Sequence, residues 1–211
     1  MIKNLQFLQE SLRFHRYNLD ISNQIHWEGT IVAESNITKK ALSSALKELI
    51  QEKPFEKISV ADICQKCNLN RQSFYYHFKD KYDLVNWVFD TEFIAVAKTT
   101  EFADQWDFLE AVCSHFYVNQ DFYRKVLAVA GQNSFAEHFR DFLHPVLERK
   151  IGELLGIEHV HDFYINFYSD ALICTIIRWL SDRHSIAPKE LIRLLKSLIH
   201  ASAVAVSEET Q

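Results

Sequence analysis

Apolar side chains return every three or four positions along most of the chain, and the alternating pattern that marks β-strands is missing. Residues 36–52 place apolar side chains on one side of a helix and lysines on the other, and Pro54 predicts where that helix ends. Gly29 and Thr30 predict a break before it. The later pattern predicts helices at 81–99, 104–118, 119–130, 133–155, 162–183 and 188–206. The sequence therefore predicts an all-α protein, with Pro145 kinking or splitting the helix that contains it.

The segment 59–82 has the pattern of two short helices separated by a tight turn. Ser59 and Asp62 have the spacing of a capping box at the start of the first helix. Asn68 stands where the chain must turn sharply, and Asn tolerates left-handed backbone better than most residues. Asn70 is placed to cap the second helix.

This second helix directs Phe74 and Phe78 to the core and polar groups outward. The outward side chains carry many hydrogen-bonding groups and no carboxylate: Arg71, Gln72, Ser73, Tyr76 and His77. Such a face suits a DNA groove, where a helix must offer donors to base edges and phosphates.

The run from Asn68 to Lys81, NLNRQSFYYHFKDK, resembles the helix-turn-helix signature of the TetR/AcrR family of bacterial transcription regulators. The aromatic run from Phe74 to Phe78, followed by Lys81, is the most specific part of the match, which covers roughly residues 36–90. Asn68 and Gln72 stand where the family often has Gly. We expect the longer side chain of Gln72 to alter base reading without abolishing binding.

The resemblance implies DNA-binding roles for individual residues. The residues implied to approach base edges are Arg71, Gln72 and Ser73. The residues implied to touch phosphates are Tyr75, Tyr76, His77 and Lys81. Ser59 and Asn70 are expected to donate to phosphate besides capping their helices. For Tyr75, the alternative is plain packing against the helix at 36–52.

Charge divides the chain into a basic and an acidic part, although the net charge is −5. Residues 36–82 hold nine Lys or Arg against five Asp or Glu, whereas residues 83–211 hold eleven against nineteen. The first segment is expected to be drawn to phosphates and the second to avoid them. We therefore predict a helix-turn-helix domain at 36–82 and a larger helical effector-binding and dimerisation domain at 83–211. Residues 1–35 form an N-terminal extension whose structure the pattern leaves open.

The stretch 163–180 is apolar nearly all round its predicted helix, so a second side needs a partner. Paired with the final helix, it predicts a four-helix bundle between two subunits. The residues expected at this dimer interface are Phe167, Leu172, Ile176, Trp179, Leu191, Leu195 and Leu198. The alternative is a helix buried wholly within one subunit.

Aromatic residues are abundant, with 16 Phe, 8 Tyr and 4 Trp, and some of them are candidates to line an effector pocket between helices. The candidates are Trp106, His115, Phe116, Tyr123, Phe139, Tyr164 and Tyr168. Plain core packing is the alternative for each.

Other chemistry is not indicated. No Gly-rich phosphate loop, nucleophile elbow or paired-carboxylate pattern occurs, so we expect no enzyme, no catalytic residue and no cofactor. Cys64 and Cys67 lack a second pair at metal-binding spacing, so we expect no metal site. The start of the chain lacks the apolar core of a signal peptide, and polar residues interrupt the stretch 163–180. We expect a cytoplasmic protein without a membrane span.

A weaker resemblance concerns the tail. Residues 163–191, with an Ile-x-Arg-Trp-Leu run and a Pro-x-Glu-Leu helix start, are similar to TetR-family proteins grouped with regulators of dihydroxyacetone kinase operons in Gram-positive bacteria. The expected function is a dimeric repressor that binds double-stranded DNA at a palindromic operator and responds to a small-molecule effector in its C-terminal domain. The alternative is an activator or a protein-interaction module controlled by a protein co-regulator.

Overall fold

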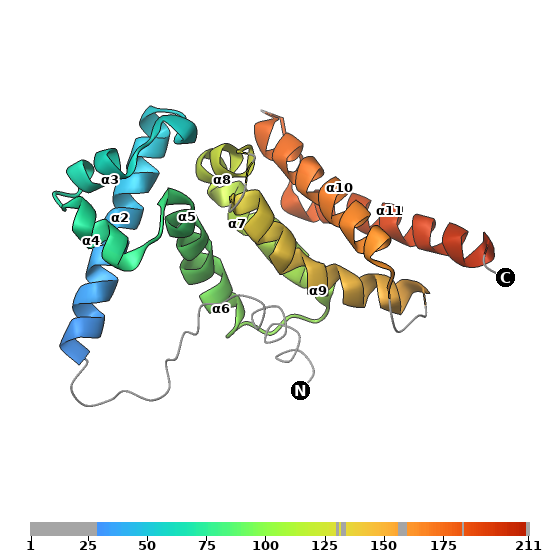
Figure 1. The fold of residues 1–211 in the computed structure, drawn as a ribbon. Coiled ribbons are helices and arrows are strands. Elements are labelled where there is room, and N and C mark those ends of the chain that lie inside the picture. The colour runs from blue at the N-terminus through green and yellow to red at the C-terminus, as the bar shows by residue number, and fades with distance from the viewer. Residues whose placement is uncertain (1–28, 130, 132–133, 156–159, 183, 210–211) are drawn as a thin grey trace.

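The computed structural model describes residues 29–129, 131, 134–155, 160–182 and 184–209, and every regular element within these ranges is helical (Figure 1). The N-terminal part of the described chain, at the left of Figure 1, is a head built around one long helix. Its elements are α2 (Gly29–Glu52), η1 (Phe55–Lys57), α3 (Val60–Lys66), α4 (Arg71–His77) and α5 (Lys81–Phe89).

The head continues into the rest of the molecule without leaving helical geometry. A π-helical turn, η2 (Asp90–Ile94), follows α5 directly and leads into the short α6 (Ala95–Ala97). The expected single helix at 81–99 is therefore interrupted by a wider turn. At the first residue of this turn, Asp90 pairs with Nε2 of His138 at 3.1 Å, which ties the connection to the body.

The body is a bundle of longer helices (Figure 1). These are α7 (Gln105–Val118), α8 (Gln120–Leu127), α9 (Phe135–Leu155), α10 (Asp162–Ser181) and α11 (Pro188–Glu209). Helix α9 packs on α10 and α11, and α11 also packs on α7. None of the helices in the described ranges has the length and apolarity to cross a bilayer.

One helix start and one helix interior differ from the prediction. Helix α2 already runs at Gly29, so the break expected at Gly29 and Thr30 and the start at Asn36 were wrong. The expectation for the extension otherwise falls on residues outside those the structure describes. Helix α9 continues through Pro145, so the alternative of a split helix was wrong too.

The end of α2 is where head and body meet. In a continuing helix the carbonyl of Ile50 would accept from the N–H of residue 54, but Pro54 has none. Lys125 of α8 supplies the missing donor through its Nζ atom. One turn earlier, Lys47 pairs with Glu92 of η2 at 2.5 Å. Two lysines thus link α2 to the body and to the connecting turn.

Candidate nucleic-acid interface

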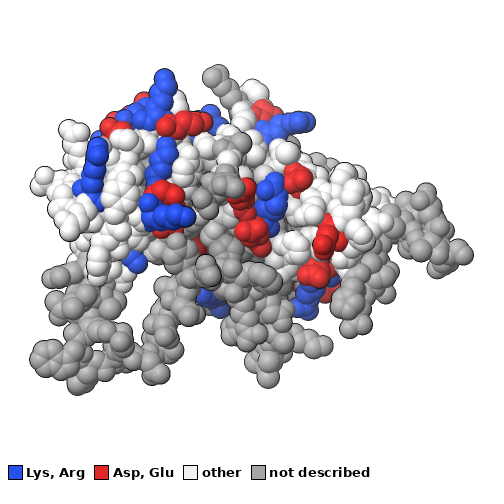
Figure 2. Space-filling view, in the orientation of Figure 1, with Lys and Arg blue, Asp and Glu red and all other residues white. Residues whose placement is uncertain are grey.

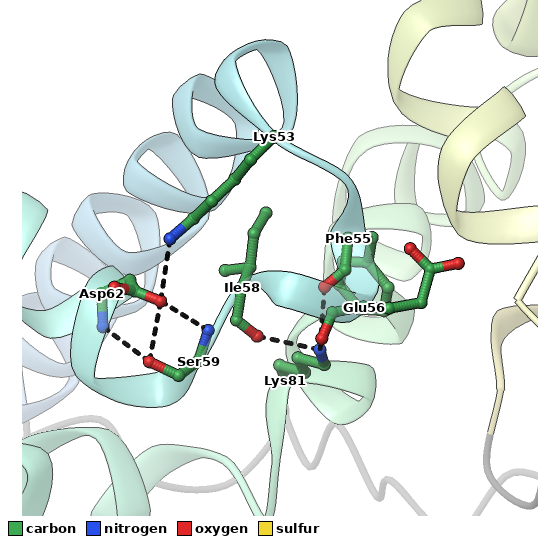
Figure 3. Close-up of polar contacts among 7 residues, drawn as sticks. All are labelled: Lys53, Phe55, Glu56, Ile58, Ser59, Asp62 and Lys81. Atoms are coloured by element: carbon green, nitrogen blue, oxygen red, sulfur yellow. Dashed lines mark hydrogen bonds and ion pairs between the residues drawn. The ribbon is translucent and has the colours of Figure 1, made fainter.

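Helix α3 begins at a complete capping box. The backbone N–H of Ser59 donates to Oδ2 of Asp62 at 2.8 Å, and the N–H of Asp62 donates back to Oγ of Ser59 at 3.2 Å (Figure 3). Lys53 adds an ion pair to the same carboxylate at 3.0 Å. Hydrogen bonds from Ser59 are the main cause that lowers the pKa of Asp62 to about 2. The predicted box is confirmed, and it fixes the start of α3.

The turn between α3 and α4 has the geometry that the sequence predicts. Asn68 has a positive φ of 56°, in the left-handed region, and the next N–H, that of Leu69, donates to the carbonyl of Cys64 at 2.8 Å. Asn70 then caps α4 by accepting from the N–H of Ser73 at 2.7 Å. Two side-chain caps and one left-handed residue therefore set the position of α4.

Helix α4 is buried on one side and open on the other. Phe74 and Phe78 are buried, as predicted, and they anchor the helix in the head. On the open side Arg71 and Gln72 are exposed, and Tyr76 is 78% exposed. The described part of this helix carries no carboxylate, so the open side presents only neutral polar groups and cations.

Tyr75 and Ser73 each contact a neighbouring residue of the head. Tyr75 is 58% exposed and meets the ring of Phe74 edge-on at 5.5 Å, so most of its surface is not packed on α2. The hydroxyl of Ser73 donates to the side-chain oxygen of Asn70 at 3.1 Å. The cap residues Ser59 and Asn70 likewise use their side-chain oxygens within their own helices.

The ammonium of Lys81 points into the head instead of outward (Figure 3). It donates to the carbonyls of Phe55 and Ile58 at 2.8 Å each and to that of Glu56 at 3.1 Å. It also lies 4.5 Å from the centre of the Phe55 ring. Burial lowers the pKa of Lys81 from its usual value. All three donors of the ammonium are used, and the sequence pattern does not indicate this structural role.

The nine cations of the head fall into two groups. Three lysines are neutralised by carboxylates, namely Lys47 by Glu92, Lys53 by Asp62, and Lys66 by Glu48 and Glu52. Lys81 is held by carbonyls. Five have no acidic partner within the part of the chain that the structure describes: Lys39, Lys40, Lys57, Arg71 and Lys79. Figure 2 shows both situations, with some blue side chains beside red ones and others surrounded by uncharged residues.

His77, the last residue of α4, is half-buried. Burial is the main cause that lowers its pKa, and the nearby charge of Lys39 lowers the pKa further. The ring is therefore neutral at pH 7, and it offers one N–H donor to a phosphate in place of a full charge.

Four of the seven residues expected around an effector pocket form a tightly packed aromatic cluster. Phe116 and Tyr123 lie 4.3 Å apart between ring centres, Phe116 and Phe139 lie 5.1 Å apart, and Nε2 of His115 lies 2.9 Å from the Tyr123 hydroxyl. Three of these four side chains are fully buried. Burial places this cluster in the core, where ring contacts fill the space between helices.

The other three expected pocket residues lie apart from this cluster. Trp106 is buried near the start of α7, and Tyr164 and Tyr168 are half-buried on α10. The hydroxyl of Tyr168 lies 2.6 Å from that of Ser202 on α11. A cavity of about 340 Å³ lies at the junction of head and body, and of the seven residues only Tyr123 lines it. Its other walls come from α2, η2, the end of α7 and the start of α8: Lys47, Gln51, Glu92, Val118, Asn119, Gln120, Asp121 and Phe122.

The expected dimer residues divide by exposure. Leu172, Ile176, Trp179 and Leu191 are buried within their own chain. Leu195 is half-buried, whereas Phe167 is 57% and Leu198 is 66% exposed.

Two further large apolar side chains, Phe163 and Leu194, are also exposed on α10 and α11. The rings of Phe163 and Phe167 stack 6.3 Å apart. The four exposed side chains Phe163, Phe167, Leu194 and Leu198 are called here the apolar strip of α10 and α11.

The trihelical head with its exposed α4 and the helical body define a helix-turn-helix transcription regulator, and comparisons with known proteins agree. Residues 42–88 match the family described as bacterial regulatory proteins, tetR family, and residues 104–201 match one described as transcriptional regulator C-terminal region. The chain belongs to the TetR family of transcription regulators, and it is therefore a regulator and not an enzyme.

Individual relatives point in the same direction. The chain is 29% identical over 151 residues to the HTH-type dhaKLM operon transcriptional activator DhaS of Lactococcus lactis subsp. lactis (strain IL1403), covering 69% of this chain and 80% of that protein. The fold is similar to that of a TetR transcriptional regulator from Streptococcus agalactiae 2603V, with a TM-score of 0.65, 24% identity and coverage of 81% and 97% of the two chains. The fold is also similar to a solved structure of a dihydroxyacetone kinase operon activator, DhaS, with a TM-score of 0.55, 23% identity and coverage of 80% of this chain and 97% of that chain.

Proposed function

We propose that this chain is a dimeric, cytoplasmic transcription regulator that binds a palindromic operator through α4. The observation that carries the proposal is the open side of α4. Its exposed Arg71, Gln72 and Tyr76 project from a helix that two buried phenylalanines and a side-chain cap hold in place. An Arg offers a fork to guanine and a Gln offers a pair of hydrogen bonds to adenine, so this side has the groups for base reading.

Dimerisation is supported by the exposed apolar strip of α10 and α11. Phe163, Phe167, Leu194 and Leu198 are large apolar side chains that a lone subunit leaves in water. A twofold axis through this strip buries them against their own copies and presents two α4 helices to two half-sites.

Control of DNA binding is proposed to come through the body, because α8 holds the end of α2 by the bond from Lys125 to Ile50. Any binding event that moves α8 changes the position of the head. A small-molecule effector that relieves repression remains the expectation from the family resemblance. Two observations favour the alternative, an activator controlled by a protein co-regulator. The aromatic cluster fills the centre of the body, and the relative from Lactococcus is named an activator.

The proposal is tested by selecting bound duplexes from a random-sequence library with the purified full-length protein. We expect a palindromic consensus, and Arg71→Ala is expected to relax the preference at one base position at a cost of roughly 1–3 kcal/mol. A reporter with that consensus upstream of its promoter gives the sign of regulation. Failure to enrich any sequence, together with equal binding by wild type and Arg71→Ala, would refute operator recognition by α4.

A further inference from the structure

The N-terminal part of α2 extends beyond the packed head. Burial along this helix begins at Leu42, whereas residues 35–41 are half-buried or exposed and Ile37 is 67% exposed. At 1.5 Å per residue, residues 29–41 make a helical segment about 20 Å long, called here the α2 overhang. In Figure 1 this blue end of α2 projects past α4.

The base of the α2 overhang borders the end of α4. Helices α2 and α4 pack on each other, and Lys39 lies close enough to His77 for its charge to act on that ring. His77 is the last residue of α4, and Lys40, next to Lys39, is exposed. One cation of α2, Lys39, therefore stands beside the end of the helix that is proposed to enter the major groove, and the exposed Lys40 follows it on α2.

Among the residues that the structure describes, these two lysines have no acidic partner, although several other lysines of the head do. The acidic residues further along α2, Glu48 and Glu52, both contact Lys66 on α3. Neither Lys39 nor Lys40 has an acidic partner within the described ranges. An unpaired cation beside a groove-reading helix keeps its full charge for a phosphate, whereas a paired one must first give up its carboxylate.

We propose that Lys39 and Lys40 contact the phosphate backbone of bound DNA, so that α2 holds the duplex beside α4. The inference rests on the proposed DNA-binding function. It adds a contact surface that lies outside the region of the head, residues 42–88, that matches the tetR family. Because an ammonium binds phosphate as a point charge, these contacts increase affinity for any duplex sequence and do not set base preference.

The experiment measures the affinity of Lys39→Gln/Lys40→Gln for two duplexes as a function of salt, between about 50 and 200 mM. One probe is a random-sequence duplex and the other is the duplex selected by the wild-type protein. Each lost phosphate contact is expected to reduce the slope of log affinity against log salt by about 0.9, so the double variant should lose nearly 2. Affinity should fall by the same factor on both probes, with the selected consensus unchanged.

Lys98→Gln is the control. Lys98 is an exposed cation at the end of α6, and its loss changes the net charge of the protein without changing the α2 overhang. It should retain the wild-type slope. An independent readout is the NMR titration of His77, whose pKa should rise in Lys39→Gln because one of its two depressing causes is removed. That shift also shows that the head is folded.

Three results would overturn the inference. If the double variant keeps the wild-type salt slope while Arg71→Ala still relaxes base preference, then Lys39 and Lys40 do not contact phosphates. The proposed function is unaffected by that result. If the pKa of His77 is unchanged in folded Lys39→Gln, then Lys39 does not lie close to the end of α4. Absence of any DNA binding by the wild-type protein removes both the inference and the proposed function.

Discussion

Lys81 and Ile58 are joined by a hydrogen bond of 2.8 Å from the Lys81 ammonium to the Ile58 carbonyl, across a separation of 23 residues. The same ammonium binds two neighbouring carbonyls in the turn that follows Pro54. This turn carries the chain from α2 to α3, and the Phe55 carbonyl also accepts from the backbone N–H of Ile58 at 3.0 Å, so Lys81 is a second donor to that oxygen. A lysine at the start of α5 therefore closes the trihelical head, in the way that a C-cap closes a helix.

Replacing Lys81 by Met should destabilise the head by about 1–3 kcal/mol, because two part-buried carbonyl oxygens, those of Phe55 and Ile58, lose a charged donor while the side-chain stem still covers the Phe55 ring. Urea unfolding followed by far-UV circular dichroism measures the loss. Lys79→Met, at an exposed position two residues earlier, should leave stability unchanged. Unaltered stability in Lys81→Met, with a salt slope on DNA reduced by about one, would instead make Lys81 the phosphate contact expected from the sequence.

Asp62 should carry part of the acid sensitivity of the head. Its pKa is lowered from 3.8 to about 2, so the ionised form is favoured by folding. Its contribution is complete above about pH 4 and is lost as pH falls through 2, because protonation then removes the capping acceptor. Carboxyl NMR should give a midpoint near 2. Ser59→Ala should raise that midpoint, because the Asp62 carboxylate loses the hydrogen bond from the Ser59 hydroxyl and keeps only the one from the Ser59 backbone N–H. A midpoint near 3.8 in the wild type would contradict the box geometry.

Aspartate in place of Phe167 or Leu198 should convert the dimer to monomers, because two like charges would face each other across the twofold axis. Light scattering after gel filtration measures the mass of the species in solution. Val118 provides the matched control, because it is 81% exposed at the end of α7 and lies on neither α10 nor α11, so Val118→Asp should remain dimeric. Dimers of unaltered strength in both strip variants would place the interface elsewhere.

The Phe139→Ala variant separates a packed core from an effector pocket. Phe139 is fully buried among Phe116, Phe135 and Phe142, so truncation should cost about 3–5 kcal/mol. Thermal unfolding measures this loss of stability. Val118→Ala is the control, and because Val118 is exposed it should change stability only slightly. A side chain that only lined an open ligand site would be truncated at little cost. Unchanged stability combined with lost ligand response would therefore favour the pocket.

Local signals in the sequence predicted the head well, because capping and turn formation depend on neighbouring residues. Ser59 and Asp62, Asn68, and Asn70 each form the contact that their spacing indicates. Phe74 is buried for an equally local reason, since one side of a short helix must pack. These positions required no knowledge of distant contacts.

Long-range contacts were beyond reach of the pattern. Lys81 turns inward because it binds carbonyls some 25 residues earlier in the chain, and no periodicity in the sequence indicates such a contact. The same holds for α10, where an apolar run cannot show that Trp179 is covered by its own chain while Phe167 is left open. The extra turns of α2 before Asn36 were missed because Gly29 is a poor helix former in isolation.

Pro54 restricts how this regulator can be recombined with others. A chimera that grafts residues 29–82 onto a foreign body loses Lys125, and the oxygen of Ile50 is then left bare at the graft junction. Lys47 loses Glu92 in the same exchange. Domain shuffling, in the laboratory or over evolutionary time, therefore has to transfer α8 and η2 together with the DNA-reading unit. The interchangeable part is larger than the helix-turn-helix.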